Sequence, residues 1–260
     1  MTAFPDKADS QDNYAFGMDW GGDEVSIGSL TNYRRYQYNL VADHIGRNVL
    51  EVGSGASRSF TRLVVDNKPD LERMLSIEPS QVLWEKYKTL GNHGFPDSVT
   101  FDSKDLFDLD VAETGDFDTA LFIHVLEHIE DDRGALNHTH GLLEDGGRVL
   151  IEVPALPFLF SVHDEMLGHY RRYNKQMLKS AIDPDLYEIE DMWYNDLIGV
   201  LGSLYFFKFR KMKLKSEQGV DAIQREGKIY DQYLIPFQQR IERFIRPPLG
   251  LSLNAVLRKK

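Results

Sequence analysis

The sequence predicts an α/β fold: a seven-stranded, mostly parallel sheet with helices on both faces and a helical cap inserted before the last strand. Three observations predict it. Short apolar runs alternate with stretches of helical periodicity from about residue 33 onward. A glycine-rich turn follows the first apolar run (49–52), and an acidic residue stands at the end of this run and of the second one (74–77). Ligands of such sheets bind where the parallel strands end, so we expect the site at that edge.

The composition of the 260 residues bounds the function. The chain has no cysteine, which excludes disulfide scaffolds, cysteine-ligated zinc modules, iron–sulfur clusters and cysteine nucleophiles. Acidic residues outnumber basic ones by 41 to 30, so no nucleic-acid partner is expected. Residues 205–260 reverse this balance with 13 basic and five acidic residues, which predicts a local anionic partner.

The first 24 residues carry six acids and one lysine, and they predict a flexible acidic arm (1–24) ahead of one domain (25–260). They contain no apolar segment typical of a signal peptide. The longest nearly apolar run, 197–207, is about half of the roughly 20 residues that span a bilayer. We therefore expect a cytoplasmic protein without stable membrane insertion.

The elements follow in order along the chain. The first predicted helix places apolar residues at helical spacing from Tyr33 to Ile45, and Gly46 is its stop signal. Seven apolar runs predict the strands: 49–52, 74–77, 99–101, 117–123, 148–153, 186–193 and 252–257. Helices are predicted at 59–65, 82–90, 132–143 and 175–181, and in most of the insertion at about 195–250. Asn174 is the expected N-cap of the helix at 175–181.

The most informative turn is Glu51-Val52-Gly53-Ser54-Gly55, because glycines permit a tight turn and a close approach of the backbone to a ligand. A P-loop would require a lysine that this turn lacks. A dinucleotide-binding turn would require a glycine where Arg58 stands, and the arginine would crowd the contact between helix and strand. The remaining pattern, acid-x-Gly-x-Gly after the first strand, resembles motif I of the class I S-adenosylmethionine (SAM)-dependent methyltransferases.

Later residues keep the order of the same family. Glu78-Pro79 ends the second strand, Ser103 to Leu106 follows the third, and the fourth runs into His124-Val125-Leu126-Glu127-His128. Gly146-Gly147 then precedes the fifth strand. The chain thus resembles a class I SAM-dependent methyltransferase of Rossmann-like fold. Its stretch 154–173 resembles a type-11/12-like bacterial subgroup that methylates small molecules.

The resemblance implies SAM as the cofactor and S-adenosyl-L-homocysteine as the product. Motif I would border the methionyl part, Glu78 the ribose and Asp105 the adenine, while the tip of the fourth strand would lie beside the sulfonium. Tyr33 or Arg35 would meet the methionine carboxylate. The implied cofactor-binding residues are Tyr33, Arg35, Glu51, Gly53, Ser54, Gly55, Glu78, Pro79, Asp105, Leu106, Ile123 and His124.

The acceptor should lie against the loop that follows the fifth strand, because this loop leaves the ligand-side edge. The catalytic candidates are His124, His163, Asp164, His169 and Tyr173, and Arg171 is a further candidate for contact with the acceptor. The loop residues could equally tie the loop to the sheet. The fourth strand lacks the [DNS]-P-P-[YFW] sequence usual in methyltransferases of adenine or glutamine amides, which disfavours that class.

The expected function is methyl transfer to an oxygen, nitrogen or carbon of a small-molecule acceptor, of anionic character. Two alternatives stay open: a SAM-binding enzyme of different chemistry, such as cyclisation, and a catalytically silent interaction module. The insertion predicts a hydrophobic lid, a solvated basic face or an amphipathic membrane contact. No metal site is predicted, because His124 to His128 matches a zinc-protease string but leaves a parallel strand and shows no third ligand.

Overall fold

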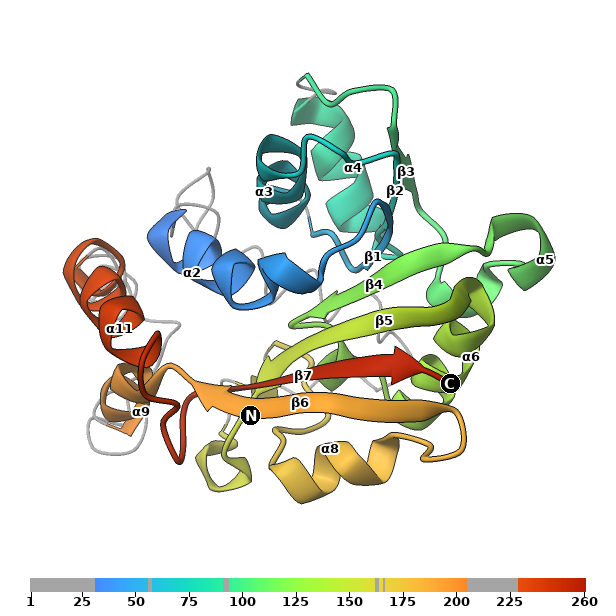
Figure 1. Ribbon diagram of the computed structural model, residues 1–260. Coiled ribbons are helices and arrows are strands. Elements are labelled where there is room, and N and C mark those ends of the chain that lie inside the picture. The colour runs from blue at the N-terminus through green and yellow to red at the C-terminus, as the bar shows by residue number, and fades with distance from the viewer. Residues whose placement is uncertain (1–30, 56–57, 91–93, 162–163, 166, 205–228) are drawn as a thin grey trace, which may run out of the picture.

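The computed structural model describes residues 31–55, 58–90, 94–161, 164–165, 167–204 and 229–260. Its centre is a seven-stranded sheet in the order β3-β2-β1-β4-β5-β7-β6 (Figure 1). The strands are β1 (Asn48–Val52), β2 (Arg73–Ile77), β3 (Val99–Asp102), β4 (Phe117–Ile123), β5 (Leu143–Pro154), β6 (Tyr187–Asn195) and β7 (Ser252–Lys259). The first five pair in parallel, and β7 runs antiparallel to both of its neighbours. The predicted fold class is confirmed.

Helix α2 precedes β1, and the other helices lie between successive strands of the chain, as the alternating pattern predicts. They are α2 (Thr31–Val41), α3 (Ser59–Asn67), α4 (Gln81–Leu90), α5 (Val111–Thr114), α6 (Asp132–Leu142), α8 (Lys175–Ala181), α9 (Leu197–Ser203) and α11 (Ile235–Glu242). Shorter turns are η3 (Ala42–His44), η4 (Leu106–Asp108), η5 (Leu126–His128), η6 (Pro157–Leu159) and the π-helical η8 (Tyr230–Leu234). The expected cap is confirmed, since the Asn174 side chain accepts a 2.8 Å hydrogen bond from the N–H of Met177.

The core has two layers, one on each face of the sheet, because successive strand side chains point to opposite faces. In β5, Val149 and Ile151 pack into one cluster with the buried residues of α6 and α8. Leu150 lies in the other cluster with residues of α2 and α3. The central strands are buried on both faces, as a sheet covered by helices on each side requires.

Most predicted boundaries agree with the structure to within two residues, and two differ by more. The first helix ends at Val41 rather than at Gly46, and a 3₁₀ turn fills the difference. Strand β5 begins at Leu143 rather than at Arg148, because Leu143 pairs with Phe117 across a register irregularity in β4. Gly146, with φ at 80°, allows the strand to pass through the glycine pair that the sequence marks as a boundary.

The insertion between β6 and β7 leaves and rejoins the sheet at one edge. Since β6 and β5 are both antiparallel to β7, β6 ends at the same edge as the parallel strands, and β7 begins there. Its described helices α9 and α11 stand at this edge, and α11 lies beside α2 (Figure 1). The predicted arm 1–24 lies outside the described residues. Within the described chain, no helix combines the length and apolar character needed to cross a bilayer.

Candidate functional site

The glycine turn after β1 is folded against the tip of β2. The N–H groups of Gly53 and Ser54 both donate to the carbonyl of Ile77, at 2.9 and 3.0 Å. Gly53 and Gly55 have φ angles of 72° and 63°, the left-handed region that favours glycine. A Cβ on Gly53 would stand 2.6 Å from Cγ2 of Val125, which follows β4. The backbone of β1 therefore approaches the β4 tip as closely as glycine allows.

Two buried carboxylates flank this turn. Glu51 in β1 accepts hydrogen bonds from the hydroxyls of Thr61 (2.5 Å) and Ser76 (2.6 Å). Glu78, after β2, accepts from the N–H of Gly55 at 2.8 Å and of Ser80 at 3.0 Å. Burial raises the pKa of both carboxyl groups, and these hydrogen bonds oppose that rise. Each oxygen of Glu78 thus takes one backbone donor, and a carboxylate has further lone-pair sites for a ligand.

The tip of β3 carries the next predicted residues. Asp105 is half-buried and is the N-cap of η4: its Oδ1 accepts a 3.0 Å hydrogen bond from the N–H of Phe107. Leu106 is buried in the core. Pro79 is half-buried beside Glu78. These residues line up with the ends of β2 and β3 at the edge that the sequence predicts.

His124, directly after β4, is held between two buried carboxylates. Its backbone is left-handed (φ 56°), and its N–H donates to the carbonyl of Glu152 at 2.8 Å. Nδ1 lies 3.3 Å from Glu127 and Nε2 lies 3.5 Å from Glu152, and both carboxylates are fully buried. Burial alone would lower the pKa of His124, but the two carboxylates raise it to about 9. At neutral pH the side chain of His124 is therefore the positively charged imidazolium, with a proton on each ring nitrogen.

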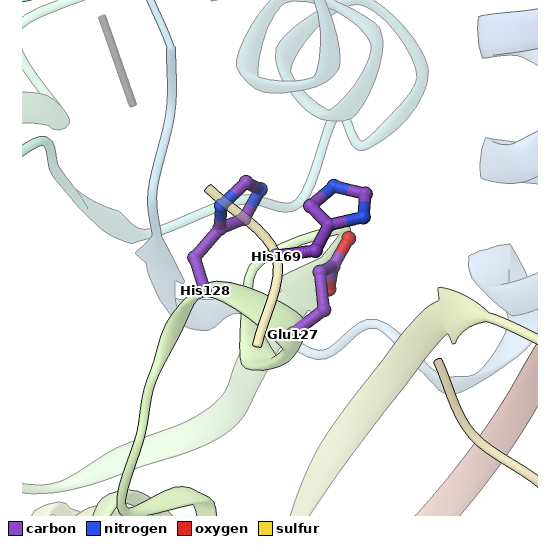
Figure 2. A group of neighbouring side chains, drawn as sticks. All are labelled: Glu127, His128 and His169. Atoms are coloured by element: carbon purple, nitrogen blue, oxygen red, sulfur yellow. The ribbon is translucent and has the colours of Figure 1, made fainter. Parts of the chain in front are cut away.

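Beside His124, two more histidines meet Glu127. His128 lies on η5 and His169 on the loop after β5, and their rings pack edge to face at 4.7 Å. Figure 2 shows both rings next to the Glu127 carboxylate. Burial lowers the pKa of His128 to about 4, so that it is neutral at pH 7. The structure thus brings the candidates His124 and His169 to one carboxylate.

The candidate Asp164 contacts other residues of the same loop. Asp164 is fully buried and accepts from Ser161, His169 and Arg172. Burial would raise the pKa of Asp164, but His169 and Arg172 lower it to about 2. Arg172, not singled out by the sequence, supplies the buried positive charge. His163 lies outside the described residues.

Tyr173 and Arg171 meet on a different carboxylate. The fully buried Tyr173 donates its hydroxyl to Asp132 at 2.9 Å, and Arg171 forms an ion pair with the same side chain at 2.8 Å. Asp132 begins α6. The Tyr173 hydroxyl also lies 3.3 Å from the carbonyl oxygen of Leu126, so these two residues connect the loop after β5 to the turn after β4 and to the start of α6.

The two neighbouring arginines of helix α2 differ in their exposure. Arg35 is exposed, whereas Arg34 is half-buried and its charge lowers the pKa of Glu51. One residue is a turn of about 100° on a helix, so only one of two neighbouring arginines can face the sheet. Tyr33 faces the site: burial and the charges of Glu152 and Asp196 raise the pKa of its phenol. Arg34, rather than Arg35, is the cation that α2 brings toward Glu51.

The insertion contributes residues that the sequence analysis missed. Tyr230 donates its hydroxyl to the buried Asp196 at 2.5 Å, and its ring lies 6.3 Å from that of Tyr33. Asp231 accepts from the N–H of Tyr33 at 2.8 Å. Because these partners lie far apart in the sequence, no local pattern predicts the contact. The residues of the candidate site thus come from the turns after β1, β2 and β4, from α2 and from η8.

This arrangement suits a ligand with hydroxyl groups at one end and ionic groups at the other. The Glu78 carboxylate can accept from hydroxyls, and the glycine turn admits a ligand close to the backbone. The Arg34 cation faces the same edge as the Glu51 carboxylate. These features fit an amino-acid-bearing nucleoside at the ends of β1 and β2.

Comparison with known proteins agrees with this geometry. A family model described as "Methyltransferase domain" matches residues 32–189. Among curated protein sequences, no significant relative is found. Similar solved structures include a chain from a Haloferax volcanii complex that contains the Trm112 methyltransferase activator, with 15% identity, 96% of each chain covered and a TM-score of 0.58.

Two further structures share the fold. The N-methyltransferase NodS from Bradyrhizobium japonicum, in complex with S-adenosyl-L-homocysteine, is 11% identical over 95% of this chain and 98% of its own, with a TM-score of 0.54. The [4+2]-cyclase SpnF is 18% identical over 92% of this chain and 85% of its own, with a TM-score of 0.55. At these identities the similarity concerns the fold.

Proposed function

Because the chain belongs to the methyltransferase-domain family, we propose that it binds SAM at the carboxyl edge of the sheet and methylates a small molecule. The methyl group goes to an oxygen or nitrogen, or to a carbon, of the acceptor, and S-adenosyl-L-homocysteine is released. The observation that carries the proposal is the pairing of the glycine turn with Glu78 through the 2.8 Å bond from Gly55. It joins the ends of β1 and β2 into one ligand-binding surface.

The residues present fit this cofactor. Glu78 has free acceptor sites for the ribose hydroxyls, and Asp105 flanks the adenine. Gly53, Ser54 and Gly55 admit the methionyl part, with Arg34 and Tyr33 placed to meet its carboxylate. When bound, the cofactor supplies an electrophilic methyl group on a sulfonium. The chain positions the acceptor and excludes water, which contributes roughly 7–11 kcal/mol in well-oriented reactions.

His124 is the side chain that we place next to the reacting centre. Since it is positively charged at neutral pH, with both ring nitrogens facing carboxylates, it acts through its charge and does not remove the acceptor's proton. Glu127 and Glu152 hold the imidazolium in position. Its charge would also attract an acceptor of anionic character, for which the basic excess of the last 56 residues provides further support.

Calorimetry with SAM tests the proposal. Wild type is expected to bind at micromolar concentration, and Gly53→Arg is expected to lose binding because its side chain would fill the approach to Val125. Gly94→Arg is the matched control, since Gly94 has a similar φ of 70° and, among the described residues, no atom within 4 Å of where its Cβ would stand. Absence of SAM binding by the folded wild type would contradict the proposal. Turnover is then followed as S-adenosyl-L-homocysteine formed with a panel of anionic hydroxyl and amine acceptors.

One alternative has a specific observation in its favour. The fold is shared with the cyclase SpnF, so bound SAM could serve chemistry other than methyl transfer. Product formation without S-adenosyl-L-homocysteine would identify such an enzyme. A silent interaction module would bind SAM and yield neither product.

A further inference from the structure

Three potential metal ligands converge at the end of β4. The coordinating atoms of Glu127, His128 and His169 all lie within 4.8 Å of one another (Figure 2). A tetrahedral zinc ion with bonds of ~2.0–2.1 Å separates its ligand atoms by about 3.3 Å. Small side-chain rotations, which move the ligand atoms by about 1 Å, would bring the three atoms to that spacing.

Glu127 is a second, independent indication of a metal site. Its side chain is fully buried. Apart from the His124 contact at 3.3 Å, neither carboxylate oxygen has a hydrogen-bond partner within the described residues. A buried carboxylate with unsatisfied oxygens is unfavourable, and a bound ion is one of the few arrangements that relieve it.

The second ring nitrogen of His169 is already oriented. Its Nδ1 lies 3.0 Å from Oδ1 of Asp164, which is itself held by Arg172 at 2.7 Å. A carboxylate on the far nitrogen of a histidine is the usual outer-shell partner of metal-binding histidines, because it fixes the tautomer and the ring plane. Nε2 of His169 is thereby left for the side that Glu127 occupies.

Hydrogen bonds to backbone carbonyls hold the loop after β5 against the turn after β4, and none of them uses the side chains of Glu127, His128 or His169. The N–H of Tyr170 donates to the carbonyl of Glu127 at 2.8 Å, and Arg171 donates to the carbonyls of Ile129 and Glu130. The loop after β5 is therefore fixed against the turn after β4 beside His169. The site is preorganised, which lowers the free-energy cost of binding.

We propose that Glu127, His128 and His169 bind one divalent transition-metal ion of the zinc class. Two imidazoles and one carboxylate are the ligand set of catalytic zinc sites, whereas magnesium and calcium prefer sites made of oxygen. Three protein ligands leave a fourth position for water or an exchangeable ligand. This site departs from the zinc-protease string of the sequence: His124 is not a ligand, and the second histidine comes from a loop about 40 residues later.

The test uses tag-free protein stripped with a chelator and then given Zn²⁺ alone. Wild type is expected to take up one zinc ion per chain with a Kd below about 1 µM, measured by calorimetry and elemental analysis. Glu127→Gln and His128→Gln should weaken binding at least 100-fold, and Asp164→Asn about 10–100-fold. His140→Gln is the control, because that ring also packs edge to face, on Tyr187, but lies outside the cluster.

Cobalt(II) substitution keeps the test independent of how the variants fold. Wild type loaded with Co²⁺ should show the intense visible bands of four-coordinate cobalt. Failure of the wild type to bind zinc, or binding equally reduced in His140→Gln, would overturn the inference. SAM binding, measured separately on the metal-free protein, distinguishes this from failure of the proposed function, since each result can hold without the other.

Discussion

The N–H of Gly55 and the Oε2 atom of Glu78 form a buried hydrogen bond of 2.8 Å that spans 23 residues of sequence. With the N–H of Ser80 on the other oxygen, it fixes the carboxylate plane at the end of β2. A carboxylate held in this way meets ribose hydroxyls without losing further conformational freedom. Affinity for the cofactor should therefore depend strongly on Glu78.

Glu78→Gln is expected to weaken SAM binding about 10- to 100-fold, because a hydrogen bond to a charged acceptor contributes roughly 1.5–3 kcal/mol. Calorimetry measures the change. Glu113→Gln removes the same charge from exposed helix α5 and should leave the affinity unchanged. Equal affinities for wild type and Glu78→Gln would show that the carboxylate makes no contact with the cofactor.

Gly53→Ala should destabilise the protein by about 2–4 kcal/mol and weaken SAM binding. Part of this is the left-handed backbone, worth roughly 1–2 kcal/mol, and the rest is the Cβ that would stand 2.6 Å from Val125. Gly94 has a similar φ of 70°, and a Cβ there would meet no atom of the described residues within 4 Å, so Gly94→Ala isolates the backbone contribution. Urea denaturation measures both.

The double variant Gly53→Ala/Val125→Ala separates the two effects further. Gly53→Ala is expected to lose more stability than Gly94→Ala, because of the contact with Val125. Removing the Val125 methyl groups should recover part of this extra loss. If Gly53→Ala is no less stable than Gly94→Ala, the close approach of β1 and β4 is not the reason for glycine at this position.

The sequence predicts elements wherever one periodicity dominates. The bounds of β4 and α8 agree with the prediction residue for residue, because β4 ends in the continuous apolar run from Ala120 to Ile123 and Asn174 caps the helix at 175–181. Glu51 and Glu78 could be placed at one edge, since parallel strands end together. These are consequences of local pattern and of one topological rule.

Contacts between distant segments could not be predicted in this way. The approach of His169 to Glu127 depends on how a loop folds back, and the contact of Asp231 with α2 joins residues 198 positions apart. The rotation of α2 about its axis could not be predicted either. Arg34 and Arg35 both match the helical pattern, and tertiary packing decides that Arg34 is the one that faces inward. Local periodicity carries no information on such contacts.

Asp231→Ala should loosen the insertion from α2. Asp231 accepts hydrogen bonds from the N–H groups of Asn32 and Tyr33 at the start of this helix, and loss of such a cap lowers stability by about 0.5–2 kcal/mol. Because α2 carries Arg34 and Tyr33, SAM affinity should fall as well. Chemical denaturation and calorimetry measure the two effects. Asp231→Asn retains an acceptor oxygen and should restore most of both, unless the capping interpretation is incorrect.

Tyr173→Phe should affect stability but not turnover. The variant loses the hydrogen bond from the phenol to Asp132, worth about 0.5–1.5 kcal/mol, while Arg171 still compensates the Asp132 carboxylate. The kcat for any accepted substrate should equal that of wild type. A kcat reduced more than tenfold, with the fold intact, would instead assign Tyr173 a catalytic role.

His124 should make stability fall with rising pH in the metal-free protein. Its folded pKa of about 9 lies above the ordinary value of 6.5, so its pairing with Glu127 and Glu152 stabilises the fold fully below pH 6.5. That contribution, on the order of 1–3 kcal/mol at this partly exposed ring, is lost as pH rises through 9. His124→Gln lacks it, so the difference in unfolding free energy between wild type and variant should shrink between pH 6.5 and 10. A ring-proton NMR titration of His124 with a midpoint near 6.5 would show instead that the two carboxylates do not hold the proton.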